Sequence, residues 1–372
     1  TFMTKIVFNL LSFSELKYYG VGVYFRDLIA KNINEIFDGI DCEIIVVHQA
    51  NIPVKELFNF PENNNITYNP VKGINGKFSR VIYEQIFMPI KFRNYNIIYS
   101  PNNINPILLG AKCKSIITIH DLLPFRKANR FGLLQRLYLK FFTYMCAHKS
   151  EKIATVSNNS KNDIINTLNV KSDKVIVTYN ILGDFKKSSI HQYDCEPFFF
   201  SVGALHEDKQ YDLMIKAFLK FKKLVNDNCK LLIAGGDHGA KKILQDLIDE
   251  LKLNDHVQLL GYITDEDKWD YYENCCALIL LGKYEGFGIP VLEAMSVNKP
   301  SIVANTGALP EIIGKAGFVI NADIDSICDA MLKSYSYKVD PKLFEDELSR
   351  FSTNKQINTL QHMFKEICKD VR

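Results

Sequence analysis

The chain has 372 residues, 47% of them hydrophobic and 23% charged, which excludes a fibrous or disordered protein and exceeds what one hydrophobic core usually holds. Its formal net charge of +3 is too small to predict nucleic-acid binding from charge alone. Nine cysteines without a Cys-x-x-Cys pair predict reduced thiols. No apolar run reaches the length of a membrane-spanning helix, and a strand-like pattern begins without a preceding signal sequence. We therefore expect a two-domain cytoplasmic protein.

Short apolar runs alternate with longer amphipathic stretches, a pattern typical of strand–helix units that form a parallel sheet. In the first half, the predicted strands are residues 5–11, 43–48, 97–100, 115–120, 152–156 and 175–178. In the second half, they are residues 198–202, 230–234, 257–260, 277–281, 301–303 and 318–320. The predicted fold class is α/β, with one domain in each half.

The domain boundary is predicted from a polar stretch at residues 183–196, which contains charges and serines but shows no periodicity. The first domain then covers residues 1–183, and the second covers residues 196–350. Beyond them, residues 354–369 carry apolar side chains at helical spacing. This terminal helix needs a partner surface.

In the first domain, Gly20 and Gly22 follow the first predicted strand and begin a helical pattern. A dinucleotide-binding fingerprint would have a third glycine where this chain has Phe25, and a shorter turn than residues 12–19. A nicotinamide-dependent dehydrogenase is therefore disfavoured. The two glycines fit either a ligand-contacting loop or an ordinary turn.

His120 and Asp121 lie at the end of a predicted strand, where open α/β sheets present their ligand-binding residues. A single histidine at a strand end is also typical of a structural residue, so this signal alone is weak. No Gly-x-Ser-x-Gly nucleophile elbow occurs, and acyl transfer has no support.

The second domain opens with a strand followed by Gly203 and Lys209, just before an amphipathic pattern at residues 211–224. A lysine in a cleft can stabilise the charge on a departing diphosphate. The alternative is a solvated lysine at the start of a helix.

The most informative segment is residues 284–295, which is predicted as a glycine loop between a strand and a helix. Gly286 and Gly288 allow close approach of a ligand to the backbone, and the following Pro290 suits the first turn of a helix. Glu285 and Glu293 flank this loop, and two carboxylates there could bracket a polyhydroxylated ligand. The alternative is a helix cap and a salt-bridged helix residue, but the glycines and proline favour the ligand site.

Two acidic triplets, residues 265–267 and 323–325, resemble metal-binding pairs at first sight. Thr264 before the first triplet, and the helical pattern after the second, fit N-caps with acidic first turns instead. We therefore expect no metal site.

Two basic, aromatic-rich stretches occur in the first domain, at residues 77–93 and 130–149. Basic amphipathic helices with aromatic residues bind anionic membranes, but helices that pack on a sheet and have cationic edges share this composition. The sequence leaves both interpretations open for each stretch.

The glycine loop with its paired glutamates resembles glycosyltransferase family 4, which comprises retaining, nucleotide-sugar-dependent enzymes. Similar stretches at residues 260–263, 299–307 and 309–311 extend the similarity over nearly the whole chain. The resemblance implies the GT-B fold, in which two Rossmann-like domains have parallel sheets facing a central cleft. It also implies that residues 354–372 return to the first, acceptor-binding domain, while the second domain binds the donor.

The resemblance implies roles for individual residues. Donor binding falls to Gly20, Gly22, Gly203, Lys209, Gly261, Tyr262, Glu285, Gly286, Phe287, Gly288, Ile289 and Glu293. Catalytic roles fall to His120, Glu285 and Lys209. One position departs from the family pattern, because Ala204 stands where an arginine is common, which leaves Lys209 as the only cation of its loop.

The function implied by the resemblance is transfer of a hexose, with retention and without a metal or other cofactor, from a nucleotide-diphosphate sugar. GDP-mannose is the first candidate donor, and a glycan or lipid-linked oligosaccharide of surface polysaccharide synthesis is the expected acceptor. We also expect possible peripheral contact of the protein with anionic lipids at the inner face of the membrane. Nucleic acid is excluded as a partner. A non-catalytic carbohydrate-binding protein and a GT-B nucleotide-sugar epimerase are the alternatives.

Overall fold

A computed structural model describes residues 3–14, 20–110, 112–126, 132–183, 196–225, 227–337 and 340–371. The chain divides into two compact units, of which the first is Thr1–Gly183 with Ser352–Arg372 and the second is Asp184–Phe351. The predicted linker lies almost entirely outside the described residues. Within the described part of the chain, no helix is both long and apolar enough to cross a membrane.

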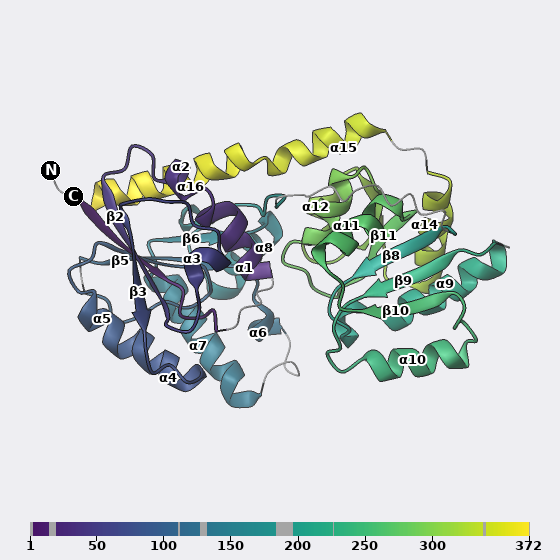
Figure 1. Cartoon of the computed structure of the whole chain (residues 1–372), viewed down its shortest axis with the longest axis horizontal. Coiled ribbons are helices and arrows are strands. Elements are labelled where there is room, and N and C mark those ends of the chain that lie inside the picture. The colour runs from purple at the N-terminus through teal and green to yellow at the C-terminus, as the bar shows by residue number, and fades with distance from the viewer. Residues whose placement is uncertain are drawn as a thin grey trace. The chain divides into compact units, whose positions relative to one another are not determined.

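The first unit is built on a seven-stranded parallel sheet in the order β3-β2-β1-β4-β5-β6-β7 (Figure 1). Its strands are β1 (Thr4–Asn9), β2 (Cys42–Gln49), β3 (Ile66–Val71), β4 (Ile97–Ser100), β5 (Lys114–Ile119), β6 (Lys152–Thr155) and β7 (Val175–Val177). The sequence did not predict β3, because Asn69 and Pro70 interrupt its apolar pattern. An edge strand that pairs only with β2 tolerates both residues.

The helices of the first unit cover this sheet. They are α1 (Gly20–Tyr24), the π-helix η1 (Phe25–Ala30), α2 (Ile33–Ile36), α3 (Val54–Leu57), α4 (Lys77–Ile82), the π-helix η2 (Tyr83–Phe87), α5 (Met88–Lys91), α6 (Leu123–Arg126), α7 (Leu133–Lys149), α8 (Asn158–Leu168), the 3-10 helix η3 (Ser172–Lys174) and α16 (Thr353–Asp370). Helix α16 packs beside α2, and its Phe364 ring lies 4.7 Å from that of Phe37 and 5.9 Å from that of Tyr99 (Figure 1). The expected return of the terminal helix to the first domain is confirmed.

The second unit has a six-stranded parallel sheet in the order β10-β9-β8-β11-β12-β13. Its strands are β8 (Phe198–Val202), β9 (Lys230–Ala234), β10 (Val257–Gly261), β11 (Ala277–Leu280), β12 (Ser301–Ala304) and β13 (Gly317–Ile320). Its helices are η4 (Glu207–Lys209), α9 (Tyr211–Leu224), α10 (Lys241–Glu250), α11 (Asp265–Asn274), α12 (Ile289–Ser296), α13 (Leu309–Ile313), α14 (Ile324–Tyr335), α15 (Pro341–Leu348) and η5 (Ser349–Phe351). The predicted α/β class, with two Rossmann-like units, is confirmed.

Local sequence explains where several of these elements lie. Helix α9 buries Met214, Ile215 and Phe218 on the face that packs in the core of the second unit, as its helical spacing predicts. Both acidic triplets are helix starts: Thr264 Oγ1 accepts a hydrogen bond of 3.0 Å from the Asp267 amide, and Asp323 caps α14. The capping interpretation of these triplets is therefore correct.

Candidate active site

The two glycine loops of the second unit meet at the carboxyl ends of neighbouring strands. The chain passes from β8 to β9 and β10 on one side and continues with β11 on the other side, so β8 and β11 form the switch point where open α/β sheets bind ligands. Lys209 follows β8, and its Nζ forms an ion pair with Glu285 Oε1 on the loop after β11. The Lys283 amide also donates to the Asp208 carbonyl, at 2.9 Å. The structure therefore brings together Lys209 and Glu285, which the sequence singled out separately.

Close packing of backbone at this edge requires a glycine after β9. A Cβ atom on Gly235 would lie 1.8 Å from the Gly203 carbonyl oxygen, and Gly235 has φ +156°. The Gly235 amide donates to the Gly261 carbonyl at 2.7 Å. The turns after β8, β9 and β10 are thus fixed against each other, and they place Gly203 and Gly261 on one edge of the sheet.

Another turn, after β12, holds the backbone of Glu285. The Ala308 amide donates to the Glu285 carbonyl at 2.9 Å, and Thr306 Oγ1 donates to the Gly282 carbonyl at 2.6 Å. A Cβ atom on Gly307 would lie 2.5 Å from the Glu285 carbonyl oxygen. These contacts hold the loop that presents the Glu285 side chain.

The segment Gly286 to Ile289 leads from this loop into α12. Gly288 is the N-cap residue at φ +102°, and Pro290 stands in the first turn of the helix. Phe287 is buried, and its ring lies edge-on to that of Phe351, with 5.7 Å between centroids. The first N–H groups of a helix have no partner within the helix, so this N-terminus suits an anionic ligand.

Glu293 lies within α12, and its two carboxylate oxygens have different protein partners. Lys268 Nζ approaches Oε1 at 2.8 Å, and the Tyr272 hydroxyl donates to Oε2 at 2.7 Å. Burial lowers the pKa of Lys268, but attraction to Glu293 and Asp265 outweighs that effect, so the pKa stands above its usual value. Burial and the Glu293 charge raise the pKa of Tyr272. Glu293 is thus a paired, positioned carboxylate.

Gly261 ends β10, and Tyr262 follows it with 73% of its surface exposed. Gly261 has φ +71°, which favours glycine at this turn. The structure therefore places Tyr262 two strands away from β8, on the same edge of the sheet as the glycine turns.

In the first unit, His120 follows β5 and is packed among other side chains. Its Nε2 lies 3.0 Å from the Pro101 carbonyl oxygen, and its ring stands edge-on to Tyr24, with 5.1 Å between centroids. Burial lowers the pKa of His120 to about 4, although the contact with the carbonyl raises it. The ring is therefore neutral at pH 7. Because a carbonyl only accepts, Nε2 carries the proton and Nδ1 is the acceptor.

Gly20 and Gly22 begin α1, the helix that also carries Tyr24. Gly22 is buried, while Gly20 is exposed at the helix start. The Tyr24 hydroxyl lies 2.6 Å from Thr178 Oγ1, which ties α1 to the end of the sheet. The structure thus places this helix start near His120 within the same unit.

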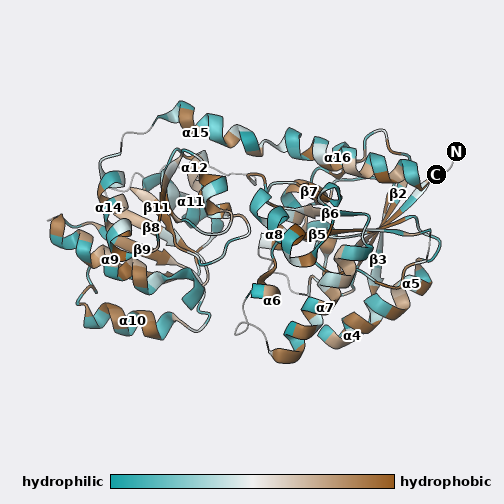
Figure 2. Cartoon of the chain, turned by 180° about the vertical axis from the view of Figure 1, so that it is seen from behind, coloured by the Kyte–Doolittle hydropathy of each residue, from teal (hydrophilic) through white to brown (hydrophobic). Residues whose placement is uncertain are grey.

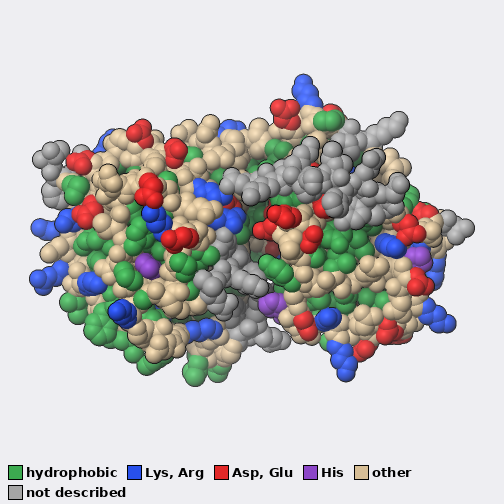
Figure 3. All heavy atoms as spheres, viewed as in Figure 1, with side chains coloured by type: hydrophobic (Ala, Val, Ile, Leu, Met, Phe, Trp, Pro, Cys, Tyr) green, Lys and Arg blue, Asp and Glu red, His purple; other side chains and the backbone are tan. Residues whose placement is uncertain are grey.

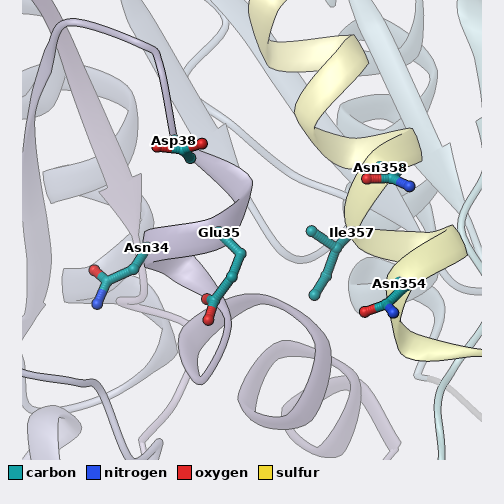
Figure 4. A pocket seen from close by; sticks show the side chains of 6 residues that line it. All are labelled: Asn34, Glu35, Asp38, Asn354, Ile357 and Asn358. Atoms are coloured by element: carbon teal, nitrogen blue, oxygen red, sulfur yellow. The ribbon is translucent and has the colours of Figure 1, made fainter.

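Two pockets in the first unit lie apart from these residues. A pocket of about 590 Å³ between α2 and α16 is lined by Asn34, Glu35, Asp38, Asn354, Ile357 and Asn358 (Figure 4). A second pocket, of about 380 Å³, is lined by Ser14, Gln49, Asn51, Ile74, Asn75, Gly76, Lys77 and Arg80. Neither pocket contains a site residue that the sequence predicted. In the described part of the chain, no cluster of three or more His, Cys, Asp or Glu residues could hold a metal ion.

Comparison with known proteins identifies the family. Residues 184–342 match the model of the family described as glycosyl transferases group 1. The O-antigen chain mannosyltransferase RfbU of Salmonella typhimurium is 30% identical over 263 residues, which cover 71% of this chain and 69% of that protein. The chain belongs to the group 1 glycosyltransferases. The O-antigen chain mannosyltransferase B of Escherichia coli is 25% identical over 254 residues, covering 65% and 66% of the two chains.

Solved structures share the fold of this glycosyltransferase. A glycosyltransferase from Rickettsia africae has a TM-score of 0.70 at 16% identity, with 99% of this chain and 98% of that chain covered. HepE of Anabaena, solved in complex with UDP and glucose, has a TM-score of 0.72 at 15% identity, with 98% and 100% covered.

Sequence reasoning missed two side chains of the site. Lys268 and Tyr272 lie on α11, and their contact with Glu293 depends on how α11 packs beside α12. Sequence reasoning also missed that the backbone amide of Lys283 joins the two loops, although the side chain of Lys283 is exposed. Only the position of Lys283, next to the Tyr284 that opens the glycine loop, could have indicated it.

Proposed function

We propose that this glycosyltransferase transfers mannose from GDP-mannose, with retention of configuration, to a glycan or lipid-linked oligosaccharide acceptor of surface polysaccharide synthesis. The observation that carries the proposal is the ion pair of Lys209 with Glu285 at the β8–β11 switch point. The choice of mannose rests on the two relatives named as O-antigen chain mannosyltransferases.

In this proposal, the two partners of the ion pair serve different parts of the donor. Lys209 donates hydrogen bonds to the diphosphate, whose negative charge grows as the bond to the sugar breaks. Glu285 accepts a hydrogen bond from a sugar hydroxyl, and the N-terminus of α12 adds N–H donors for the phosphates. Glu293, held by Lys268 and Tyr272, accepts hydrogen bonds from the ribose hydroxyls.

The proposed reaction forms one bond and breaks one on the same face of the sugar. The acceptor oxygen bonds to the anomeric carbon as the bond from that carbon to the diphosphate oxygen breaks, and the acceptor proton passes to the departing diphosphate. No covalent enzyme intermediate and no metal take part. In the first unit, the neutral His120 offers Nδ1 as an acceptor for a sugar hydroxyl.

Product analysis with the purified full-length chain tests the proposal. GDP-mannose, UDP-glucose and UDP-galactose are each supplied with lipid-linked acceptor, with and without a chelator of divalent cations. We expect transfer from GDP-mannose alone, unchanged by the chelator, and an α linkage in the proton NMR spectrum of the product. A β linkage would contradict retention of configuration. Loss of transfer with the chelator would contradict the metal-independent mechanism, and transfer from a UDP-sugar would contradict the choice of donor.

A further inference from the structure

Exposed apolar side chains are concentrated on one part of the first unit. Ten of the fifteen large hydrophobic side chains that are exposed among the described residues lie between positions 78 and 144. We name these ten the apolar face: Phe78, Ile86, Phe87, Ile90, Leu108, Leu133, Leu134, Leu137, Phe141 and Tyr144. Figure 2 shows the brown segments of α4, α5 and α7 to which most of them belong, and Figure 3 shows hydrophobic side chains gathered over α4 and α5 at the lower left.

Helix α7 exposes a row of large apolar side chains. Leu134, Leu137 and Phe141 recur at a spacing of three or four residues and are 83%, 55% and 55% exposed. The residues that α7 buries are Thr143, Cys146 and Ala147, which are small or polar. The helix also packs large apolar side chains against the core of the first unit, namely Tyr138, Leu139 and Phe142. It therefore covers the sheet and exposes a second apolar row. The interpretation of α7 as a core-packing helix is therefore correct for one row of its large apolar side chains, and it does not account for the exposed row.

The continuous helical segment from α4 through η2 to α5 also exposes large apolar side chains. Phe78 is 79% exposed and Ile90 is 65% exposed, whereas Glu84 and Met88 on the same segment are buried. Glu84 is held inside by Asn9, whose Nδ2 donates to it at 3.2 Å, and by Arg80. This segment thus places its only carboxylate inside and two of its three aromatic side chains, Phe78 and Phe87, outside, while Tyr83 packs against the core.

Hydrogen bonds to one loop connect the two helical segments. Gln85 of η2 donates to the Asn105 carbonyl at 3.2 Å and accepts from the Ile107 amide at 3.1 Å. Lys149 at the end of α7 donates to the Ile107 carbonyl at 2.9 Å. Leu108, which follows directly, is 68% exposed. Both helical segments are therefore tied to one loop, which itself exposes Leu108.

The chain segment that carries the apolar face is rich in basic residues. Residues 71–150 contain 13 Lys and Arg against 2 Asp and Glu, whereas the rest of the chain contains 32 against 40. Three of these cations, Arg80, Lys114 and Arg126, form ion pairs with carboxylates, which neutralises part of the positive charge. Lysine and arginine side chains can lay their aliphatic stems along apolar surface while their charges reach lipid phosphates.

We infer that the apolar face docks on a bilayer that contains anionic phospholipids, with its aromatic and leucine side chains in the headgroup region and the surrounding lysines and arginines on the lipid phosphates. Exposed apolar surface bordered by basic residues is the chemistry that such a bilayer binds. A two-fold dimer through the same face would set like charges against each other, which disfavours a second copy as occupant. The inference extends the lipid-linked acceptor of the proposed function, because it places the first unit where such an acceptor resides.

Vesicle binding by the full-length chain tests this inference without donor or acceptor. The vesicles contain phosphatidylcholine alone or phosphatidylcholine with phosphatidylglycerol. We expect binding to the anionic vesicles only, weakened by salt, and a loss of affinity of at least about tenfold in the double variant Leu134→Ser with Phe141→Ser, since binding scales with buried apolar area. The double variant Lys77→Gln with Lys140→Gln should weaken binding and reduce its dependence on salt.

The matched control is Leu224→Ser with Ile243→Ser, which removes two exposed apolar side chains from the second unit and should leave vesicle binding unchanged. Far-UV circular dichroism verifies that each variant is folded. A further double variant, Phe78→Ser with Phe87→Ser, repeats the vesicle test on the segment from α4 to α5. Equal binding to neutral vesicles, no binding by the wild type, or equal losses in the control would overturn the inference. So would a dimer, detected by light scattering, that Leu134→Ser with Phe141→Ser dissociates. Transfer from GDP-mannose to a soluble acceptor is measured separately, so a failed donor assignment leaves the vesicle result intact.

Discussion

At the scale of single residues, Lys209 and Glu285 depend on each other. Their side chains are 27% and 18% exposed, and they belong to loops that are 76 positions apart in the sequence. Removing one partner of a partly buried ion pair leaves the other charge poorly compensated. Each residue therefore positions the other before a donor binds.

We predict that Lys209→Ala lowers the rate of transfer by on the order of a hundredfold, because it removes both a cation near the diphosphate and the partner of Glu285. In the double variant Lys209→Ala with Glu285→Gln, the fold-reduction in transfer rate should be smaller than the product of the two single reductions, since both residues act through one ion pair. Steady-state kinetics measure this coupling. Lys283→Ala, an exposed lysine on the same pair of loops, is the control and should retain most activity. Wild-type rates in Lys209→Ala would remove the assignment.

His120 makes the stability of the first unit depend on pH. Its pKa in the folded chain is about 4, below the usual 6.5, so between these values the unfolded chain takes up a proton that the folded chain does not. The contribution of His120 to stability is therefore complete above about pH 6.5 and is lost as the pH falls toward 4. Because the ring stays neutral, we also expect no change in the transfer rate from its titration between about pH 6 and pH 8.

Replacing His120 tests this linkage. In His120→Asn, the loss of folding free energy between about pH 7 and pH 5 should be smaller than in the wild type, as measured by urea unfolding. His238→Asn removes an exposed histidine from the second unit and should show the wild-type dependence on pH. If both variants kept the full dependence, His120 would not be the group responsible.

At the scale of elements, the carboxyl edge of the second sheet depends on the turn after β9. The Gly203 carbonyl oxygen occupies the space that a side chain on Gly235 would need. Gly203 in turn donates its amide to Ala234 at 2.9 Å and accepts from Tyr211 at 3.0 Å. A change at Gly235 therefore moves the loop that carries Lys209.

We predict that Gly235→Ala lowers the free energy of unfolding by at least about 2 kcal/mol and reduces transfer, because Cβ would overlap a backbone oxygen at a strained φ. Gly236→Ala is the matched control in the next position, where nothing lies within 4 Å of the added Cβ. It should change stability by less than about 1 kcal/mol. Thermal unfolding and kinetics of the two variants provide the comparison, and equal stability of both would contradict the steric argument.

Elements whose pattern is local were predictable, and those that depend on packing were not. Residues 211–224 form α9 as expected, because their apolar spacing alone specifies a buried face. The glycine loop before α12 was found for a similar reason, since Gly288 and Pro290 mark a helix start within the sequence itself. The contact of Lys268 with Glu293 joins two helices, and nothing in the acidic sequence around Lys268 indicates it. The sequence could not show which large side chains of α7 are exposed, because helical spacing shows which residues share a face but not whether that face is buried.

At the scale of the whole molecule, the C-terminal chain contributes to both units. Helix α15 belongs to the second unit, where Phe344 is fully buried, and α16 belongs to the first, where Phe364 is fully buried. The sequence has a single tryptophan, Trp269, which lies on α11 of the second unit and is 7% exposed. Its fluorescence therefore reports the unfolding of the second unit, whereas circular dichroism reports both.

We predict that Phe364→Ala and Phe344→Ala, which delete the same side chain from two adjacent helices, destabilise different units. Each should cost about 3–5 kcal/mol, as buried phenylalanines do, but the loss should fall on the unit whose core contains the ring. Phe344→Ala should shift the unfolding midpoint seen by Trp269 fluorescence, and Phe364→Ala should leave it in place while shifting part of the transition seen by circular dichroism. Denaturant titrations with both probes measure this. Equal shifts of the fluorescence midpoint in the two variants would show that the units unfold as one, and that the terminal helix couples their stabilities.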